Sequence, residues 1–180
     1  MSGKSTLLRS IGLNSVLAQM GSVVFADSLI QPPLELQTSI RVQDSVADGV
    51  SFYFAELTRL KQVVEAARSR QKQNDQRMLF FLLDEILQGT NSRERQIAVC
   101  QVLKKLIEFD AIGAISTHDL ELVNAEELKS SFQPVHFRET ISEIDGKREM
   151  DFDYLMREGV ATTTNALELL RMVGLGEESP

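Results

Sequence analysis

Two adjacent carboxylates, Asp84 and Glu85, follow an unbroken run of six apolar residues, Met78 to Leu83. A short run of this kind is typical of a strand that is buried on both faces in the middle of a parallel sheet. Acids at the carboxyl end of such a strand lie where α/β sheets bind their ligands. Nucleotide hydrolases use the first acid to hold Mg²⁺ and the second to orient or deprotonate the attacking water. The alternative is a solvated helix N-terminus, where acidic residues are favoured in any case.

The first residues match the second half of a phosphate-binding motif, G-x-x-x-x-G-K-[ST], with Ser2 leading into Gly3, Lys4, Ser5 and Thr6. In this motif Gly3 permits close approach of the backbone to phosphate, Lys4 reaches the β- and γ-phosphates, and the Ser5 hydroxyl ligates Mg²⁺. The helix that follows points its N-terminus at the phosphates. Taken alone, the short G-K-S sequence is equally compatible with an ordinary helix cap.

Counting back along the motif places its first glycine, and the strand before it, ahead of Met1. We therefore expect the chain to be a fragment that lacks the first strand and the start of the phosphate loop.

Ser51 ends a polar loop and opens a long helical pattern that we expect to run to about Gln73. One interpretation is a helix N-cap, a frequent role of serine. Its place upstream of the acid pair favours a second one. In ATPases that close two heads around ATP, such a loop of one head contacts the γ-phosphate held by the other.

His118 follows a second apolar strand, predicted at Ala111–Ile115. A histidine at the carboxyl tip of a core strand can donate a hydrogen bond to a γ-phosphate or to the attacking water. The alternative is a capping or surface histidine. His136 alternates with Val135 and Phe137 in a predicted strand, which indicates a structural role.

The remaining periodicity predicts an α/β fold with a central, mostly parallel sheet, flanking helices and antiparallel additions. Besides the two strands named above, the expected strands are 23–26 and 37–43, with an antiparallel pair, 132–144 and 150–156, around Asp145-Gly146; the expected helices are 6–20, 51–73, 93–109 and 166–173.

The composition is that of one soluble globular domain, with 180 residues, of which 43% are hydrophobic and 25% charged. The net charge of −7 argues against a surface that wraps DNA. The single cysteine, Cys100, lies in a helical pattern, which excludes a disulfide framework and favours a buried position. The sequence has no apolar run of about 18 residues, so we expect no membrane segment and a cytoplasmic location.

Five segments in this order resemble the ATPase domain of the MutS family of DNA mismatch-repair proteins, and they cover almost the whole chain. They are MSGKST, DSVADGVSFYFAEL, FFLLDEILQGTNS, STHDLEL and YLMREGVATTTNALELLRMVGL. The resemblance implies a P-loop NTPase fold of the ABC type, a single ATPase domain over 1–180 with a helical dimerisation element at 163–180, and ATP and Mg²⁺ as cofactors.

By motif, the resemblance assigns Mg²⁺ to Ser5 and Asp84 and catalysis to Glu85 and His118. Its nucleotide-binding residues are Ser2, Gly3, Lys4, Ser5 and Thr6, with Ser51 acting in trans, and with Thr90 and Asn91 in the loop that communicates across the dimer. The implied function is ATP hydrolysis coupled to a dimeric clamp on mismatched DNA. The dimer is a homodimer or a MutS-like heterodimer, and DNA is contacted by upstream domains outside this chain.

Three departures from the family pattern indicate a divergent MutS-like branch. Gln88 stands where arginine is usual, Val50 stands where arginine or lysine is common, and Arg93-Glu94-Arg95 replaces a Tyr-Asp-Gly-like continuation. Two alternatives remain open. One is another two-headed ABC-type ATPase of chromosome maintenance or recombination, or a transporter head, although the chain lacks an LSGGQ-like signature. The other is a DNA-binding scaffold that has lost hydrolysis.

Overall fold

The computed structural model describes residues 3–40, 52–73, 76–88, 91–144 and 147–161. Ser2, Ser51, Thr90, the helix expected at 166–173 and the dimerisation element at 163–180 lie outside these residues. The chain divides into two compact units. The larger is Ser5–Phe132, and the smaller combines Met1–Lys4 with Gln133–Pro180.

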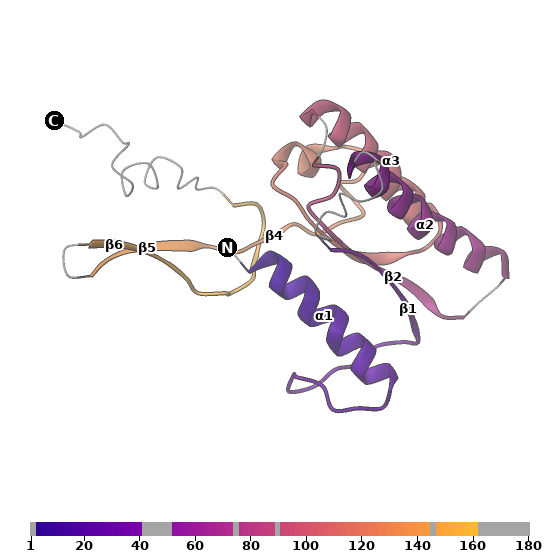
Figure 1. Cartoon of the computed structure of the whole chain (residues 1–180), viewed down its shortest axis with the longest axis horizontal. Helices are drawn as coiled ribbons and strands as arrows, with labels where there is room; N and C mark the ends of the chain where they lie inside the picture. The colour runs from indigo at the N-terminus through magenta and orange to yellow at the C-terminus, as the bar shows by residue number, and fades with distance from the viewer. Residues whose placement is uncertain (1–2, 41–51, 74–75, 89–90, 145–146, 162–180) are drawn as a thin grey trace. The chain divides into compact units, whose positions relative to one another are not determined.

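The larger unit is built on a parallel three-stranded sheet in the order β1-β2-β3 (Figure 1). Its strands are β1 Leu34–Ser39, β2 Met78–Asp84 and β3 Ile112–Ser116. The central strand is the one that carries the acid pair. In the register of β2 and β3, Asp84 lies opposite Ser116. The carboxyl ends of these two strands therefore meet at one edge of the sheet.

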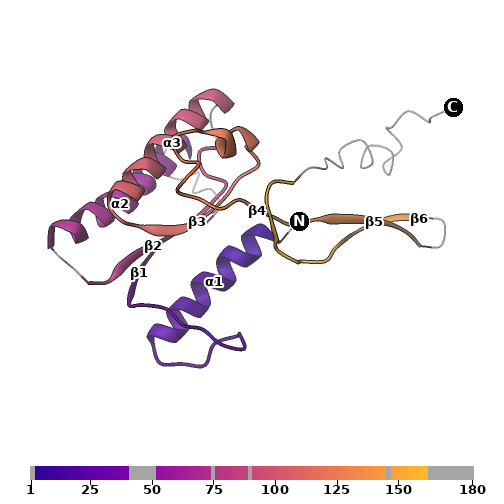
Figure 2. The same ribbon diagram turned by 180° about the vertical axis from the view of Figure 1, so that it is seen from behind.

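Helices cover both faces of this sheet. They are α1 Lys4–Gln19, α2 Phe52–Gln73 and α3 Ser92–Glu108, and a short 3₁₀ helix, η2 Leu120–Asn124, follows β3. Figures 1 and 2 show α2 and α3 on one face of the sheet and the body of α1 on the other. Each crossover between consecutive strands carries a helix, as parallel pairing requires.

The alternation of side chains along β2 explains its unbroken apolar run. Leu79, Phe81 and Leu83 belong to the core beneath α2 and α3. Leu82, which is fully buried, faces α1, where a Cβ added to Gly12 would lie 3.0 Å from its Cδ1. Burial on both faces confirms the prediction for this strand. The core under α2 and α3 also includes Leu60, Val63, Ala67, Val99, Leu103, Leu106 and Leu128.

The segment after α1 differs from the prediction. Gly21, with φ +72°, caps α1 by donating its N–H to the Ala18 carbonyl. The prediction of a strand at 23–26 is wrong, because this segment is hydrogen-bonded to α1 and does not pair with a sheet. The Phe25 N–H donates to Oδ1 of Asn14 over 2.6 Å, and the residue is 95% exposed. The following strand, β1, begins at Leu34, earlier than predicted.

The single cysteine packs at the edge of the core. Cys100 is half-buried on α3 against the cluster beneath α2 and α3. Burial raises the pKa of its thiol above the ordinary 9.0. These features fit the predicted role as a small packing residue.

In its described residues, the smaller unit contains two antiparallel strand pairs. Strand β5 Glu139–Ile144 pairs with β6 Lys147–Phe152, which confirms the predicted hairpin with shorter strands. Strand β4 Val135–His136 pairs with β7 Arg157–Glu158. Nδ1 of His136 lies 3.0 Å from the Gly159 carbonyl oxygen, which is a structural contact. Throughout the described ranges, no helix combines the length and apolar character needed to cross a membrane.

Candidate active site

The first predicted metal ligand, Asp84, is buried at the carboxyl edge of the sheet. The hydroxyl of Ser116 donates a hydrogen bond to its Oδ1 across the β2–β3 register. Each of the two residues is only 6% exposed. Because a buried carboxylate is costly without hydrogen-bond donors, Ser116 stabilises the position of Asp84. Sequence reasoning did not identify Ser116, which lies one residue beyond the strand predicted there.

The chain turns sharply at Glu85, immediately after β2. Glu85 adopts φ 48° and Leu87 φ 60°, both in the left-handed region that residues other than glycine rarely occupy. The Glu85 N–H donates to the Ser116 carbonyl over 3.0 Å, while Ile86 and Leu87 are buried. Such strain costs about 1–3 kcal/mol per residue and clusters at functional sites. The buried side chains of Ile86 and Leu87 anchor the turn, and the Glu85 side chain is left at the sheet edge.

The Glu85 carboxylate is held from two sides. Nε2 of His118 lies 2.5 Å from its Oε1, and the amide Nε2 of Gln88 donates to its Oε2 over 2.5 Å. The Glu85 side chain is 19% exposed and that of His118 is 69% exposed. The two residues to which the sequence assigned catalysis are therefore brought together. Gln88, noted in the sequence only as a departure from the family pattern, contacts the same carboxylate.

Asn91, predicted to lie in a loop that communicates across a dimer, is the N-cap of α3. Its Oδ1 accepts the backbone N–H of Glu94 over 2.9 Å. This is the usual use of an asparagine side chain at a helix start. The capping bond fixes where α3 begins relative to the turn at Glu85.

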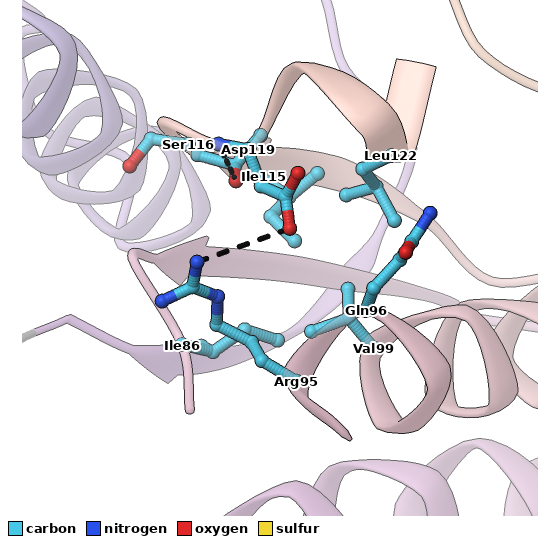
Figure 3. A pocket seen from close by; sticks show the side chains of 9 residues that line it. Ile86, Arg95, Gln96, Val99, Ile115, Ser116, Asp119 and Leu122 are labelled. Atoms are coloured by element: carbon cyan, nitrogen blue, oxygen red, sulfur yellow. Dashed lines mark hydrogen bonds and ion pairs between the residues drawn. The ribbon is translucent and has the colours of Figure 1, made fainter. Parts of the chain in front are cut away.

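The residues after His118 form a second small turn. The backbone N–H of Asp119 donates to Oγ1 of Thr117 over 2.9 Å, and Oδ1 of Asp119 accepts the N–H of Glu121 at the start of η2. Its Oδ2 lies 3.9 Å from a guanidinium nitrogen of Arg95 on α3. Figure 3 shows Arg95 reaching across a small pocket toward Asp119. Sequence reasoning missed this ion pair, because its partners lie on separate elements.

The residues of the phosphate motif are divided between the two units. Ser5 and Thr6 lie in the first turn of α1 within the larger unit, whereas Gly3 and Lys4 belong to the smaller unit. Gly3 has φ +86°, and a Cβ at this position would lie 3.0 Å from Cδ1 of Tyr154. The backbone conformation and the close contact both favour glycine at this position.

The donor set at the sheet edge suits Mg²⁺ better than a metal with a full protein cage. Among the residues with described positions, no group of three or more His, Cys, Asp or Glu side chains could hold a metal ion. Mg²⁺ at nucleotide sites takes oxygen ligands, with one or two from the protein and the others from phosphate and water. Asp84 offers a carboxylate fixed by Ser116, so the residues present fit this ion.

The fold and the sheet edge define an α/β domain with candidate ligand-binding residues at the carboxyl ends of parallel strands. The family described as MutS domain V matches residues 1–179 of the chain. The chain therefore belongs to the MutS family, through its C-terminal domain V.

Individual relatives agree with this assignment. The chain is 31% identical over 180 residues to the DNA mismatch repair protein MutS of Natronomonas pharaonis, a match that covers 98% of this chain and 20% of the relative. It is 30% identical over 182 residues to the MutS of Pseudothermotoga lettingae, a match that covers 99% of this chain and 21% of the relative. For the MutS of Thermotoga petrophila the identity is 28% over 176 residues, and the match covers 97% of this chain and 21% of the relative. The chain thus spans about a fifth of the length of these relatives.

Proposed function

We propose that this domain binds and hydrolyses ATP with Mg²⁺, on a P-loop fold of the ABC type. The observation that carries the proposal is the contact of 2.5 Å between Glu85 and His118, beside the buried carboxylate of Asp84. Three functional groups from two neighbouring strands meet at the edge where α/β sheets bind their ligands. The relatives named MutS and the half motif at Gly3 to Thr6 support the same assignment.

The chain's own residues supply positioning and electrostatics, which provide most of the catalysis in phosphoryl transfer. Lys4 contacts the phosphates, while Ser5 and Asp84 are the residues that would hold the metal. When bound, Mg²⁺ supplies charge neutralisation on the β- and γ-phosphates. Glu85 orients the attacking water and accepts its proton, and His118 donates a hydrogen bond to the γ-phosphate or the water.

The described geometry adds one condition to this mechanism. Both oxygens of the Glu85 carboxylate are already in contact with a neighbouring side chain, Oε1 with Nε2 of His118 and Oε2 with the donating amide of Gln88. A water molecule can share an oxygen through its second lone pair or can replace one donor. We therefore infer that nucleotide binding rearranges the exposed His118 ring away from Glu85, toward the phosphate.

For the whole protein we propose a MutS-like, DNA-binding dimer in which the nucleotide state controls a clamp on mismatched DNA. Ser51 and the Thr90–Asn91 loop act between two heads, and the element at 163–180 contributes to dimerisation. DNA is contacted by parts of the protein outside this chain. The support is the MutS identity of the relatives, which are about five times longer than this chain.

A second candidate is a DNA-binding scaffold without hydrolysis. The observation that favours it is Gln88, which replaces a usual arginine and occupies one oxygen of the candidate base. A turnover assay separates the two functions, because a scaffold binds ATP but releases no phosphate above background.

The test is a set of variants in a protein that carries a complete phosphate loop ahead of Gly3, since residues 2–6 match only the second half of the motif. Glu85→Gln is expected to retain nucleotide binding and to lose about 10²–10⁴-fold in hydrolysis, the range for general-base roles. Lys4→Ala is expected to weaken binding itself. Glu126→Gln removes an exposed carboxylate of the same unit outside the site and serves as the control. If Glu85→Gln and Lys4→Ala both bind and turn over ATP like the parent, the site assignment is wrong.

A further inference from the structure

We propose that the ion pair between Arg95 and Asp119 is a positioning device for His118, an inference that rests on the proposed function. The pair joins the first turn of α3 to the turn that carries the histidine. The distance from the Arg95 guanidinium nitrogen to Oδ2 of Asp119 is 3.9 Å, and the side chains are 29% and 13% exposed. The proposed mechanism uses neither residue directly.

His118 depends on its backbone for its position, because its side chain is 69% exposed and packing does not hold the ring. The residues on either side are fixed instead. Asp119 donates its N–H to Thr117, caps η2 through Glu121, and faces Arg95 with its second carboxylate oxygen. These interactions place the backbone from which the His118 ring reaches Glu85.

Arg95 connects this turn to the other side of the site. Its backbone N–H donates to the Asn91 carbonyl over 3.0 Å, and Asn91 caps α3 shortly after the turn of Glu85 and Gln88. The side chains of Glu85 and His118 are thus linked directly by their 2.5 Å contact and indirectly through Arg95 and Asp119. A shift of the α3 start is transmitted to His118 by the second connection.

The surroundings of the pair favour a real interaction. Arg95 and Asp119 border a pocket whose other walls include Val99, Ile115 and Leu122, and Figure 3 shows these apolar side chains around the pair. Apolar walls reduce screening by water, so the attraction is stronger than between fully exposed charges.

The chain provides a matched control for a purely structural role. Lys104 pairs with Glu127 and likewise joins α3 to the segment after β3. Asp119 is the residue next to His118, whereas Glu127 lies further along the chain. If these ion pairs only hold α3 against the segment after β3, removing either pair should have the same effect. If the pair of Arg95 and Asp119 positions His118, only the removal of this pair should change the signals of the His118 ring.

The first experiment needs no turnover. The chain contains two histidines, His118 and His136, so long-range ¹H–¹⁵N spectra at one fixed pH resolve both rings in the 180-residue chain. Arg95→Met and Asp119→Asn are expected to shift or broaden the His118 signals and to leave His136 unchanged. The asparagine can still accept the Glu121 N–H, so the cap of η2 is retained. Arg95→Lys should restore most of the parental spectrum, and Lys104→Met should change neither ring. Unchanged His118 signals in both Arg95→Met and Asp119→Asn overturn the proposal.

The second experiment measures turnover in the protein with a complete phosphate loop. Arg95→Met and Asp119→Asn should lower kcat about tenfold at unchanged ATP affinity, because misplacement of a catalytic group by a fraction of an ångström slows the chemical step. Arg95→Lys should recover most of kcat, and Lys104→Met should match the parent. An equal loss in Lys104→Met, or no loss in any variant, overturns the positioning role while the ATPase assignment stands. A parent without turnover refutes the ATPase assignment, and the spectra then decide alone whether the pair holds His118.

Discussion

Nε2 of His118 and Oε1 of Glu85 are 2.5 Å apart, so side chains that follow two neighbouring strands are in direct contact. We predict that His118→Ala lowers kcat by less than Glu85→Gln does, because His118 donates a hydrogen bond whereas Glu85 accepts the proton of water. ATP affinity should stay near that of the parent. Single-turnover hydrolysis beside equilibrium nucleotide binding measures both effects. A His118→Ala protein with parental kcat would remove the histidine from the mechanism.

The bond from Ser116 to Asp84 gives a prediction for stability. Ser116→Ala leaves one oxygen of a buried carboxylate without its donor, so the free energy of unfolding should fall by about 1–3 kcal/mol. Urea unfolding of the chain followed by circular dichroism measures the change. Ser131→Ala, at an exposed serine of the same unit, is the control and should stay within about 0.5 kcal/mol of the parent. Equal stability of the two variants would show that Asp84 does not depend on Ser116.

A third prediction concerns the smaller unit. Hydrogen bonds from Arg157, and then from the Leu155 N–H, lower the pKa of Asp153 from 3.8 to about 2. A carboxyl whose pKa is lowered by folding stabilises the folded state above its unfolded pKa. This contribution is lost as the pH falls from about 3.8 to about 2.

The measurement is a carboxyl ¹³C titration of Asp153 by NMR. The midpoint should lie near 2 in the parent and move toward 3.8 in Arg157→Gln, which lacks the cation. Arg157→Lys keeps the charge but not the two-nitrogen contact, so it should lie between them. A parental midpoint already at 3.8 would contradict the contact.

The elements that surround the site could be predicted from local pattern. Strand β2 and its acid pair follow from an apolar run that stops abruptly at Asp84, and α3 follows from its helical periodicity. The hydrogen bond between Ser116 and Asp84 could not be predicted from local pattern. It depends on the register between two strands, which neither strand's own pattern specifies. The Gln88 contact with Glu85 depends on the left-handed turn at Glu85 and Leu87, for which the sequence carries no glycine signal.

The errors in the fold have the same origin. The segment 23–26 has the composition of a strand, but a strand needs a partner, and Asn14 of α1 accepts a backbone N–H of this segment instead. In the smaller unit, Val135 and His136 pair with Arg157 and Glu158 and do not extend the hairpin. Such short pairings are chosen by tertiary contacts between segments distant in sequence, so local pattern cannot identify them.

The last prediction concerns Ser51, the residue before α2, which lies outside the described residues. In a two-headed ATPase, a serine at this place donates a hydrogen bond to the γ-phosphate of the other head, and the start of α2 adds a favourable dipole. Ser51→Ala should therefore slow hydrolysis and weaken dimer closure driven by ATP. Nucleotide binding at a single site should stay near that of the parent, because the serine acts on the partner's nucleotide.

Mixing two variants with impaired turnover tests this arrangement. Ser51→Ala lacks the residue that acts in trans, and Lys4→Ala lacks the residue that binds phosphate in its own head. A mixed dimer has one site in which both residues are intact. Equal amounts should restore up to about a quarter of parental turnover, since half of the dimers are mixed and each has one complete site. If mixed dimers form and no activity returns, Ser51 is only the N-cap of α2, the simpler role that its position at a helix start also allows.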